Sequence, residues 1–198
     1  MATREVHMIV IGGSSGALDA LAAMLPALPP DYPLPLAVVL HVPPTQPSHL
    51  VAVLGARSRL TAREPDDKEP IMPGTLYVAP PNYHLLVERG RTFALSIDPP
   101  VLFSRPAIDV LFESAADVYG PHLAGVLLSG ANEDGARGLE HVRRAGGLTF
   151  VESPATAAVP VMPAAALRRI AVDHVAPAAD LGRLLAQLAA TPRPEDKA

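Results

Sequence analysis

Short, wholly apolar segments alternate along the chain with segments in which apolar residues recur every three or four positions. The first pattern is typical of strands buried on both faces of a parallel sheet, and the second is typical of amphipathic helices. Four segments predict buried strands, at 7–13, 36–42, 124–129 and 148–152. Six segments predict helices, at 16–27, 48–56, 107–119, 135–144, 164–169 and 179–190.

The middle of the chain has a different pattern. Between residues 60 and 98 the segments LTARE, TLYVAP, HLLVE and TFALSI are separated by turns, which predicts a meander-like antiparallel excursion beside the parallel sheet. The alternation elsewhere predicts an α/β fold, a doubly wound and mostly parallel sheet with helices on both faces. We expect a single domain over residues 1–190 and a flexible C-terminal tail at 191–198.

Composition narrows the class of protein. The chain has 198 residues, 49% of them hydrophobic, which is enough for one sizeable core. Its net charge of −4, its pI near 5.9 and its 4% aromatic content exclude an electrostatic nucleic-acid binder. The absence of cysteine excludes disulfides and a cysteine nucleophile. No apolar run is long enough to span a membrane and no signal peptide is evident, so we expect a cytoplasmic protein without membrane insertion.

The first chemical signal is a glycine-serine turn between the first strand and the first helix. Residues 12–16, Gly-Gly-Ser-Ser-Gly, match the G-x-S-x-G spacing of a nucleophile elbow, in which a tight turn exposes the Ser14 hydroxyl. The free N–H groups at the start of the helix would face a developing oxyanion, and the Ser15 N–H is the candidate donor. Alternatively, Ser14 or Ser15 only caps the helix, or the turn cradles a phosphate, although the G-x-G-x-x-G spacing is absent.

A histidine and an aspartate follow two other predicted strands. His41 lies near the end of LAVVLHV, just before Pro43 and Pro44, and Asp134 follows the strand at 124–129. Taken singly, His41 can be a partly buried histidine with one backbone hydrogen bond, and Asp134 can cap the helix that follows it. Because the carboxyl ends of parallel strands share one edge, the three groups can also meet within hydrogen-bonding range. The order Ser, His, Asp differs from the Ser, Asp, His order of α/β-hydrolases.

The other histidines have no comparable setting, and His84, after a Pro-Pro-Asn-Tyr turn, is the second choice. No pair of histidines has a metal-ligand spacing such as H-E-x-x-H, so we expect no metal site.

Six stretches of the chain carry a resemblance to a known family. They are VIGGSSGALDAL, VVLHVPP, GTLYVAPPNYHLLVERG, SRPAIDVLFESAA, GVLLSGANEDGARGL and AGGLTFVESPATAAVPVMPAAAL, spanning roughly residues 8–170 in the family's order. The chain thus resembles the catalytic domain of the bacterial chemotaxis protein-glutamate methylesterase. The resemblance implies a serine hydrolase that demethylates glutamate methyl esters on chemoreceptors, with Ser14 as nucleophile, His41 as general base and Asp134 as the acid that orients it.

The resemblance implies further properties. The oxyanion and substrate-binding residues would be Ser15, Gly13 and Ala131, and no cofactor would be needed. The same site would also deamidate receptor glutamines. The partners would be the methylated cytoplasmic helices of chemoreceptors and a separate response regulator. Arg105 is either a solvated surface arginine or a contact for an acidic receptor surface.

The chain departs from the family pattern at four places. Gly130-Ala131-Asn132-Glu133 replaces a glycine-methionine-glycine stretch, Val161-Met162-Pro163 replaces glycine-methionine-proline, and Glu152 replaces a frequent glutamine. Many family members also carry a receiver domain before the catalytic domain. Because Met1 lies a few residues before the first strand, we expect a stand-alone form without that domain.

Two other functions stay open on the sequence alone. One is an esterase of the same fold that acts on an ester outside chemotaxis. The other is a non-catalytic binding module that uses the serine turn as an anion nest.

Overall fold

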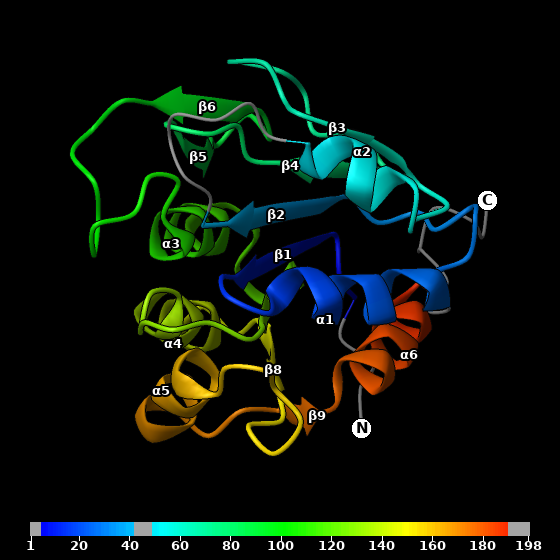
Figure 1. The fold of residues 1–198 in the computed structure, drawn as a ribbon. Coiled ribbons are helices and arrows are strands. Elements are labelled where there is room, and N and C mark those ends of the chain that lie inside the picture. Colours follow the sequence, from blue (N-terminus) through cyan, green and yellow to red (C-terminus); the bar gives the residue numbers. More distant parts are fainter. Residues whose placement is uncertain (1–4, 42–48, 190–198) are drawn as a thin grey trace.

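The computed structural model describes residues 5–41 and 49–189. Seven strands form one parallel sheet in the order β3-β4-β2-β1-β7-β8-β9, and β5 and β6 form a separate antiparallel pair (Figure 1). The strands are β1 Met8–Gly13, β2 Leu36–Leu40, β3 Thr61–Arg63, β4 Thr75–Val78, β5 His84–Val87, β6 Phe93–Ser96, β7 Leu123–Leu127, β8 Leu148–Glu152 and β9 His174–Ala176.

Six α-helices accompany the strands, together with two short 3-10 helices. The α-helices are α1 Ala17–Met24, α2 Leu50–Gly55, α3 Ile108–Tyr119, α4 Ala136–Arg144, α5 Val161–Arg169 and α6 Ala178–Leu188. The 3-10 helices are η1 Leu25–Ala27, which follows α1 directly and contains Pro26, and η2 Gly120–His122. No helix within the described residues is both long and apolar enough to cross a lipid bilayer.

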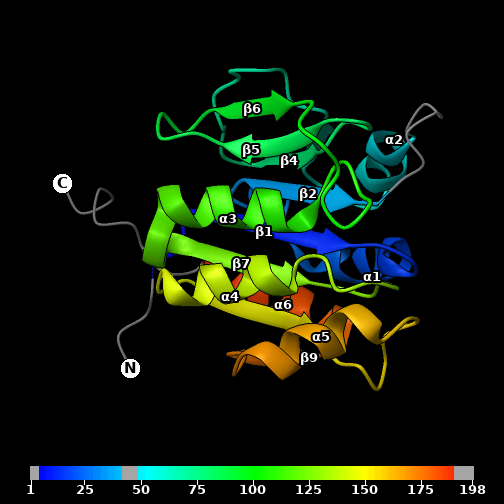
Figure 2. The same ribbon diagram turned by 90° about the vertical axis from the view of Figure 1, so that its left-hand side faces the viewer.

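The helices cover both faces of the sheet. In Figure 2, α3 and α4 lie in front of the strands, while α1 and α6 lie behind them. Each face has its own core: Leu21 and Leu181 belong to the core under α1 and α6, and Phe112 and Leu139 belong to the core under α3 and α4. The strands β1, β2 and β7 run between these two cores and are buried at every residue. This burial on two sides explains why their sequences are continuously apolar.

The predicted fold class is confirmed, but the middle of the chain is corrected. The segments LTARE and TLYVAP form β3 and β4, which pair in parallel at the edge of the main sheet beside β2. Only β5 and β6 form the antiparallel excursion. Two further elements differ from expectation, because α5 begins three residues before the predicted start and β9 was not predicted. The predicted tail at 191–198 lies outside the described residues, and the boundary at residue 190 stays a prediction.

The strand order places a topological switch point in the middle of the sheet. From β1 the chain proceeds outward through β2 on one side, and β7, on the other side of β1, is followed outward by β8 and β9. Ligands of open parallel sheets bind at such a point, beyond the carboxyl ends of the strands. Ser14, His41 and Asp134 follow β1, β2 and β7, the three neighbouring strands at this point.

Candidate active site

The serine turn is held on both sides by backbone hydrogen bonds. The Ser14 N–H donates to the carbonyl of Ser129 at 2.9 Å, and the Ala17 N–H donates to the carbonyl of Ser14 at 3.0 Å. A Cβ at Gly13 would lie 2.3 Å from the Ala17 Cβ, so only glycine lets the helix begin this close to the strand. The N-cap of α1 is Gly16, in the left-handed region with φ of 83°, and no side chain caps the helix. The alternative that Ser14 or Ser15 serves as a helix cap is therefore wrong.

Two main-chain N–H groups near Ser14 are available as donors, one in the serine turn and one in the loop after β7. Ser15 is exposed, and none of its neighbours within the described residues accepts a hydrogen bond from its N–H. Its carbonyl instead accepts the Ser129 hydroxyl at 3.0 Å, which orients the peptide. In the loop after β7, the Gly130 N–H is used by the Val159 carbonyl at 3.0 Å, whereas exposed Ala131 donates to no group in the part of the chain that the structure describes.

His41 lies directly beside the serine turn. Its N–H donates to the Gly13 carbonyl at 3.3 Å, and the register that pairs Gly13 with Leu40 places Ser14 opposite His41 when it is continued by one residue. Neighbouring strands are about 4.8 Å apart, so the two side chains start from adjacent positions. The His41 Nε2 is 2.8 Å from the Asp134 Oδ2. With Asp134 ionised, Nε2 carries the proton and Nδ1 has the lone pair of a base.

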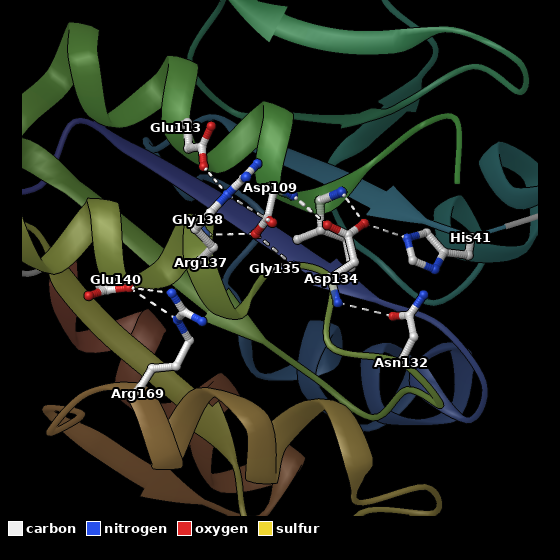
Figure 3. A network of polar contacts seen from close by, with 11 residues as sticks. His41, Asp109, Glu113, Asn132, Asp134, Gly135, Arg137, Gly138, Glu140 and Arg169 are labelled. Atoms are coloured by element: carbon white, nitrogen blue, oxygen red, sulfur yellow. Dashed lines mark hydrogen bonds and ion pairs between the residues drawn. The ribbon is translucent and has the colours of Figure 1, made fainter. Parts of the chain in front are cut away.

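The Asp134 carboxylate is fully buried and binds the start of α3 (Figure 3). Its Oδ2 accepts the Ile108 N–H at 2.7 Å, and its Oδ1 accepts the Asp109 N–H at 3.0 Å. Helix N-termini carry free donors and the positive end of the dipole, and α3 presents both to this carboxylate. The N-cap of α4, Gly135, has no side-chain cap, so the alternative that Asp134 caps its own helix is wrong.

A second buried carboxylate, which the sequence did not single out, completes this network. The Asp109 Oδ1 accepts the N–H groups of Gly135 at 2.9 Å and Gly138 at 2.7 Å, and Oδ2 lies 3.4 Å from the Arg137 Nε (Figure 3). Burial raises the pKa of Asp109 to about 6, against the opposing effect of the Gly138 N–H. Asp134 thus binds the N-terminus of α3 while Asp109, from α3, binds the N-terminus of α4.

A third buried acid supports the serine turn from behind. The Glu152 Oε2 accepts the Ser129 N–H at 2.8 Å, and Ser129 binds Ser14 and Ser15 as described above. Burial raises the pKa of Glu152, and the Ser129 N–H opposes the shift. An amide oxygen of glutamine at this position could accept the same bond.

A small pocket of about 130 Å³ opens beside His41. Its other lining residues are Asn82, Pro100, Phe103, Ser104, Arg105 and Pro106. The Arg105 guanidinium donates to the Asn82 Oδ1 at 2.7 Å and to the Ile97 carbonyl at 2.7 Å, so it fixes this loop and is not a merely solvated arginine. His84 is a structural residue, since it is 1% exposed and its ring binds the Pro99 carbonyl and the Ala107 N–H.

One trio of possible metal ligands occurs within the described residues, and it lies at the other end of the sheet. Single ligand atoms of Glu5, His7 and His122 come within 4.8 Å of one another. Because His7 precedes β1 and His122 precedes β7, the trio is at the amino ends of the strands whose carboxyl ends carry Ser14 and Asp134.

Comparisons with known proteins agree on one family. A family model described as CheB methylesterase matches residues 9–185. A putative protein-glutamate methylesterase/protein-glutamine glutaminase of Leptospira interrogans is 44% identical over 84% of this chain and 86% of the relative. The protein-glutamate methylesterase/protein-glutamine glutaminase 2 of Anaeromyxobacter dehalogenans is 43% identical over 93% of this chain but only 54% of the relative.

The fold comparison gives the same answer. The crystal structure of the Thermotoga maritima CheB methylesterase catalytic domain superimposes with a TM-score of 0.88 at 33% identity. The match covers 92% of this chain and 98% of that one. The chain therefore corresponds over nearly its whole length to a catalytic domain, and it spans about half the length of the Anaeromyxobacter relative.

Proposed function

The chain belongs to the CheB methylesterase family, and from this premise we propose that it is a protein-glutamate methylesterase that hydrolyses glutamate γ-methyl esters on chemoreceptors. The observation that supports the proposal most is the 2.8 Å contact between His41 and Asp134, beside a serine turn on the neighbouring strand. We assign Ser14 as the nucleophile, His41 as the general base and Asp134 as the residue that orients the imidazole.

The first half of the reaction forms an acyl-enzyme. The His41 Nδ1 accepts the hydroxyl proton of Ser14 as its oxygen attacks the γ-carbonyl carbon of the esterified glutamate. The negative charge that develops on the carbonyl oxygen is bound by the N–H groups of Ser15 and Ala131, and each such donor typically lowers the barrier by roughly 3 kcal/mol. The bond to the methoxy group then breaks, and the leaving oxygen takes the proton from His41 to give methanol.

The second half restores the enzyme. A water molecule gives a proton to His41 and attacks the acyl carbon, after which Ser14 leaves with that proton. The glutamic acid product then releases its remaining carboxyl proton to solvent and departs as the carboxylate. Asp134 keeps the imidazole in one tautomer and stabilises the imidazolium, and the two N–H donors from α3 hold the carboxylate in place. Gly13 contributes the absence of a side chain, which lets α1 begin close to the end of β1 and so holds Ser14 at the turn.

The family premise extends the proposal to related properties. The same attack on a glutamine side chain would release ammonia, so we assign a deamidation activity to the site as well. The substrates would be the cytoplasmic helices of chemoreceptors, so the protein would act in the cytoplasm, under the control of a response regulator.

Methanol release from a carboxyl-methylated chemoreceptor cytoplasmic fragment tests the proposed function. Wild-type protein should release methanol, and Ser14→Ala should lower kcat/KM by roughly a thousandfold or more, because the step that needs the nucleophile is lost. Ser58→Ala is the matched control and should retain activity, because among residues 5–41 and 49–189 the hydroxyl is bound by the Leu60 N–H alone. Hydrolysis of small acyl esters without methanol release from the receptor fragment would contradict the chemotactic function.

A further inference from the structure

A tight turn beside the site has an unusual sequence for its backbone. Between β6 and α3, Val101 and Ser104 exchange two backbone hydrogen bonds of 3.1 and 2.9 Å around Leu102 and Phe103. Both central residues have positive φ, 47° for Leu102 and 64° for Phe103. A two-residue turn with positive φ at both central positions favours Asn-Gly, since bulky side chains are disfavoured there. Leucine and phenylalanine therefore occupy positions at which they oppose the local backbone.

Burial in the core does not offset the unfavourable backbone conformation of Leu102 and Phe103, because neither side chain belongs to the core. Phe103 is 102% exposed and Leu102 is 42% exposed, so the phenylalanine ring has as much solvent contact as in an extended peptide. Strained residues persist at functional sites, where the conformation serves a purpose other than stability. An exposed aromatic side chain on such a turn is suited to insertion into a binding partner.

The turn is continuous with the active site. Phe103 lines the pocket that also contains His41, and in Figure 1 the segment between β6 and α3 extends past the sheet on the side of the β2 arrowhead. Phe103, Ser104 and Arg105 of the pocket lining form one rim of this pocket. A polypeptide whose glutamate side chain approached His41 through the pocket would pass over this rim, so the residues flanking that glutamate would come next to the turn.

A positive charge lies next to the turn. Arg105 donates only to the neutral oxygens of Asn82, Ile97 and Asp98, the last through its main-chain carbonyl. Within the described residues no carboxylate lies within 4.0 Å of its guanidinium, so it forms no ion pair there. The rim thus combines an exposed phenylalanine with a cation, which is complementary to a segment that carries apolar and acidic residues.

We propose that Leu102 and Phe103 form a docking turn that binds the segment of the protein substrate flanking the esterified glutamate. The inference rests on the proposed function and adds a recognition element outside the catalytic residues. The docking turn determines how well a protein substrate is bound, whereas the chemistry at Ser14 does not depend on it.

The double variant Leu102→Asn/Phe103→Gly tests the inference, because it supplies the residues that the backbone favours and removes the apolar side chains. We expect kcat/KM for methanol release from the methylated receptor fragment to fall at least tenfold. The rate at which a small fluorophosphonate labels Ser14 should stay within twofold of wild type, and the thermal unfolding temperature should be unchanged or higher. Met72→Asn, at a residue that is 55% exposed and does not line the pocket, is the control and should match wild type in all three measurements.

The other outcomes would overturn the inference. Equal losses in methanol release and in labelling would show that the turn shapes the active site instead of binding substrate. An unchanged kcat/KM would show that no substrate contact exists there, and a wild-type dimer that the double variant converts to monomer would identify a second copy as the occupant. Absence of methanol release by wild type would contradict the proposed function itself. If wild type and the double variant released methanol at the same rate, only the docking turn would be contradicted.

Discussion

At the scale of single residues, the site depends on carboxylates that the fold keeps away from water. Asp134 is fully buried, but it accepts two main-chain N–H groups and the His41 Nε2, so its charge is well solvated by the protein. Asp109 is 2% exposed and is bound by two N–H groups, yet burial still raises its pKa to about 6. Two neighbouring acids thus play different parts: one orients the base and the other joins two helices.

The raised pKa of Asp109 gives a prediction about stability and pH. Because the folded protein holds the Asp109 proton up to about pH 6 and the unfolded chain releases it near pH 3.8, the contribution of Asp109 to stability falls as pH rises through this interval. Asp109→Asn does not titrate there. Its free energy of unfolding relative to wild type should therefore rise between pH 4 and pH 7, by up to about 3 kcal/mol, and then level off. Urea unfolding at several pH values measures this difference, and a flat or falling difference would contradict the assignment.

The sequence predicted the residues that stand in a recognisable pattern and missed those that do not. Ser14, His41 and Asp134 each follow a buried strand, and a parallel sheet brings such positions to one edge. Asp109 lies inside the first turn of a helix, where an acidic residue is ordinary on its own. Its partners Gly135 and Gly138 are 26 and 29 residues away along the chain, and only the packing of α3 on α4 brings them together.

At the scale of elements, the close approach of α3 and α4 holds the site together. A Cβ at Gly138 would lie 2.7 Å from the Phe112 Cβ and 3.0 Å from the Asp109 Cα, so the two helices meet at this glycine. Two carboxylates cross the interface. Asp134, just before α4, binds the N-terminus of α3, and Asp109, in the first turn of α3, binds the N-terminus of α4. Any separation of α3 from α4 therefore also moves Asp134 relative to His41.

Gly138→Ala tests this coupling of packing to catalysis. The added methyl group has to push α3 away, and we expect a loss of about 1–3 kcal/mol in the free energy of unfolding, as is typical of overpacking. The kcat for methanol release should fall by at least tenfold at temperatures where the variant is folded. Gly55→Ala is the control, because a Cβ there approaches no atom closer than 3.3 Å. Loss of stability with wild-type kcat would show that the interface does not position Asp134.

The length and regularity of the hydrophobic pattern also determined which helices and strands could be predicted. Long apolar strands and amphipathic helices were found, whereas β9, which was missed, has only three residues, all exposed or half-buried. The equally short β3 was predicted as a segment, but its pairing was predicted wrongly. Such segments carry too little alternation to reveal a strand, and no local pattern tells a strand which neighbour it pairs with. The start of α5 was missed because Pro163 lies within it, although proline is tolerated in a first helical turn.

At the scale of the whole molecule, the order of the strands produces the site. The switch point between β1 and β7 leaves the carboxyl ends of β2, β1 and β7 side by side, and each end supplies one of the three residues that we assign to catalysis. The helices on both faces bury these strands, the loops after β1 and β7 supply the main-chain donors, and the segment between β6 and α3 supplies the proposed docking turn. The fold class could be predicted because alternation of strands and helices leaves few possible arrangements, whereas the placement of β3 and β4 required the three-dimensional structure.

Covalent labelling tests the central claim most directly, that Ser14 is a nucleophile activated by His41 and Asp134. Wild-type protein, Ser14→Ala and Ser58→Ala are treated with a fluorophosphonate, and the adduct is located by peptide mass spectrometry. We predict one adduct per chain at Ser14 in wild type and Ser58→Ala, and none in Ser14→Ala. Labelling of a different residue, undiminished labelling of Ser14→Ala, or no adduct on folded wild-type protein would contradict the account.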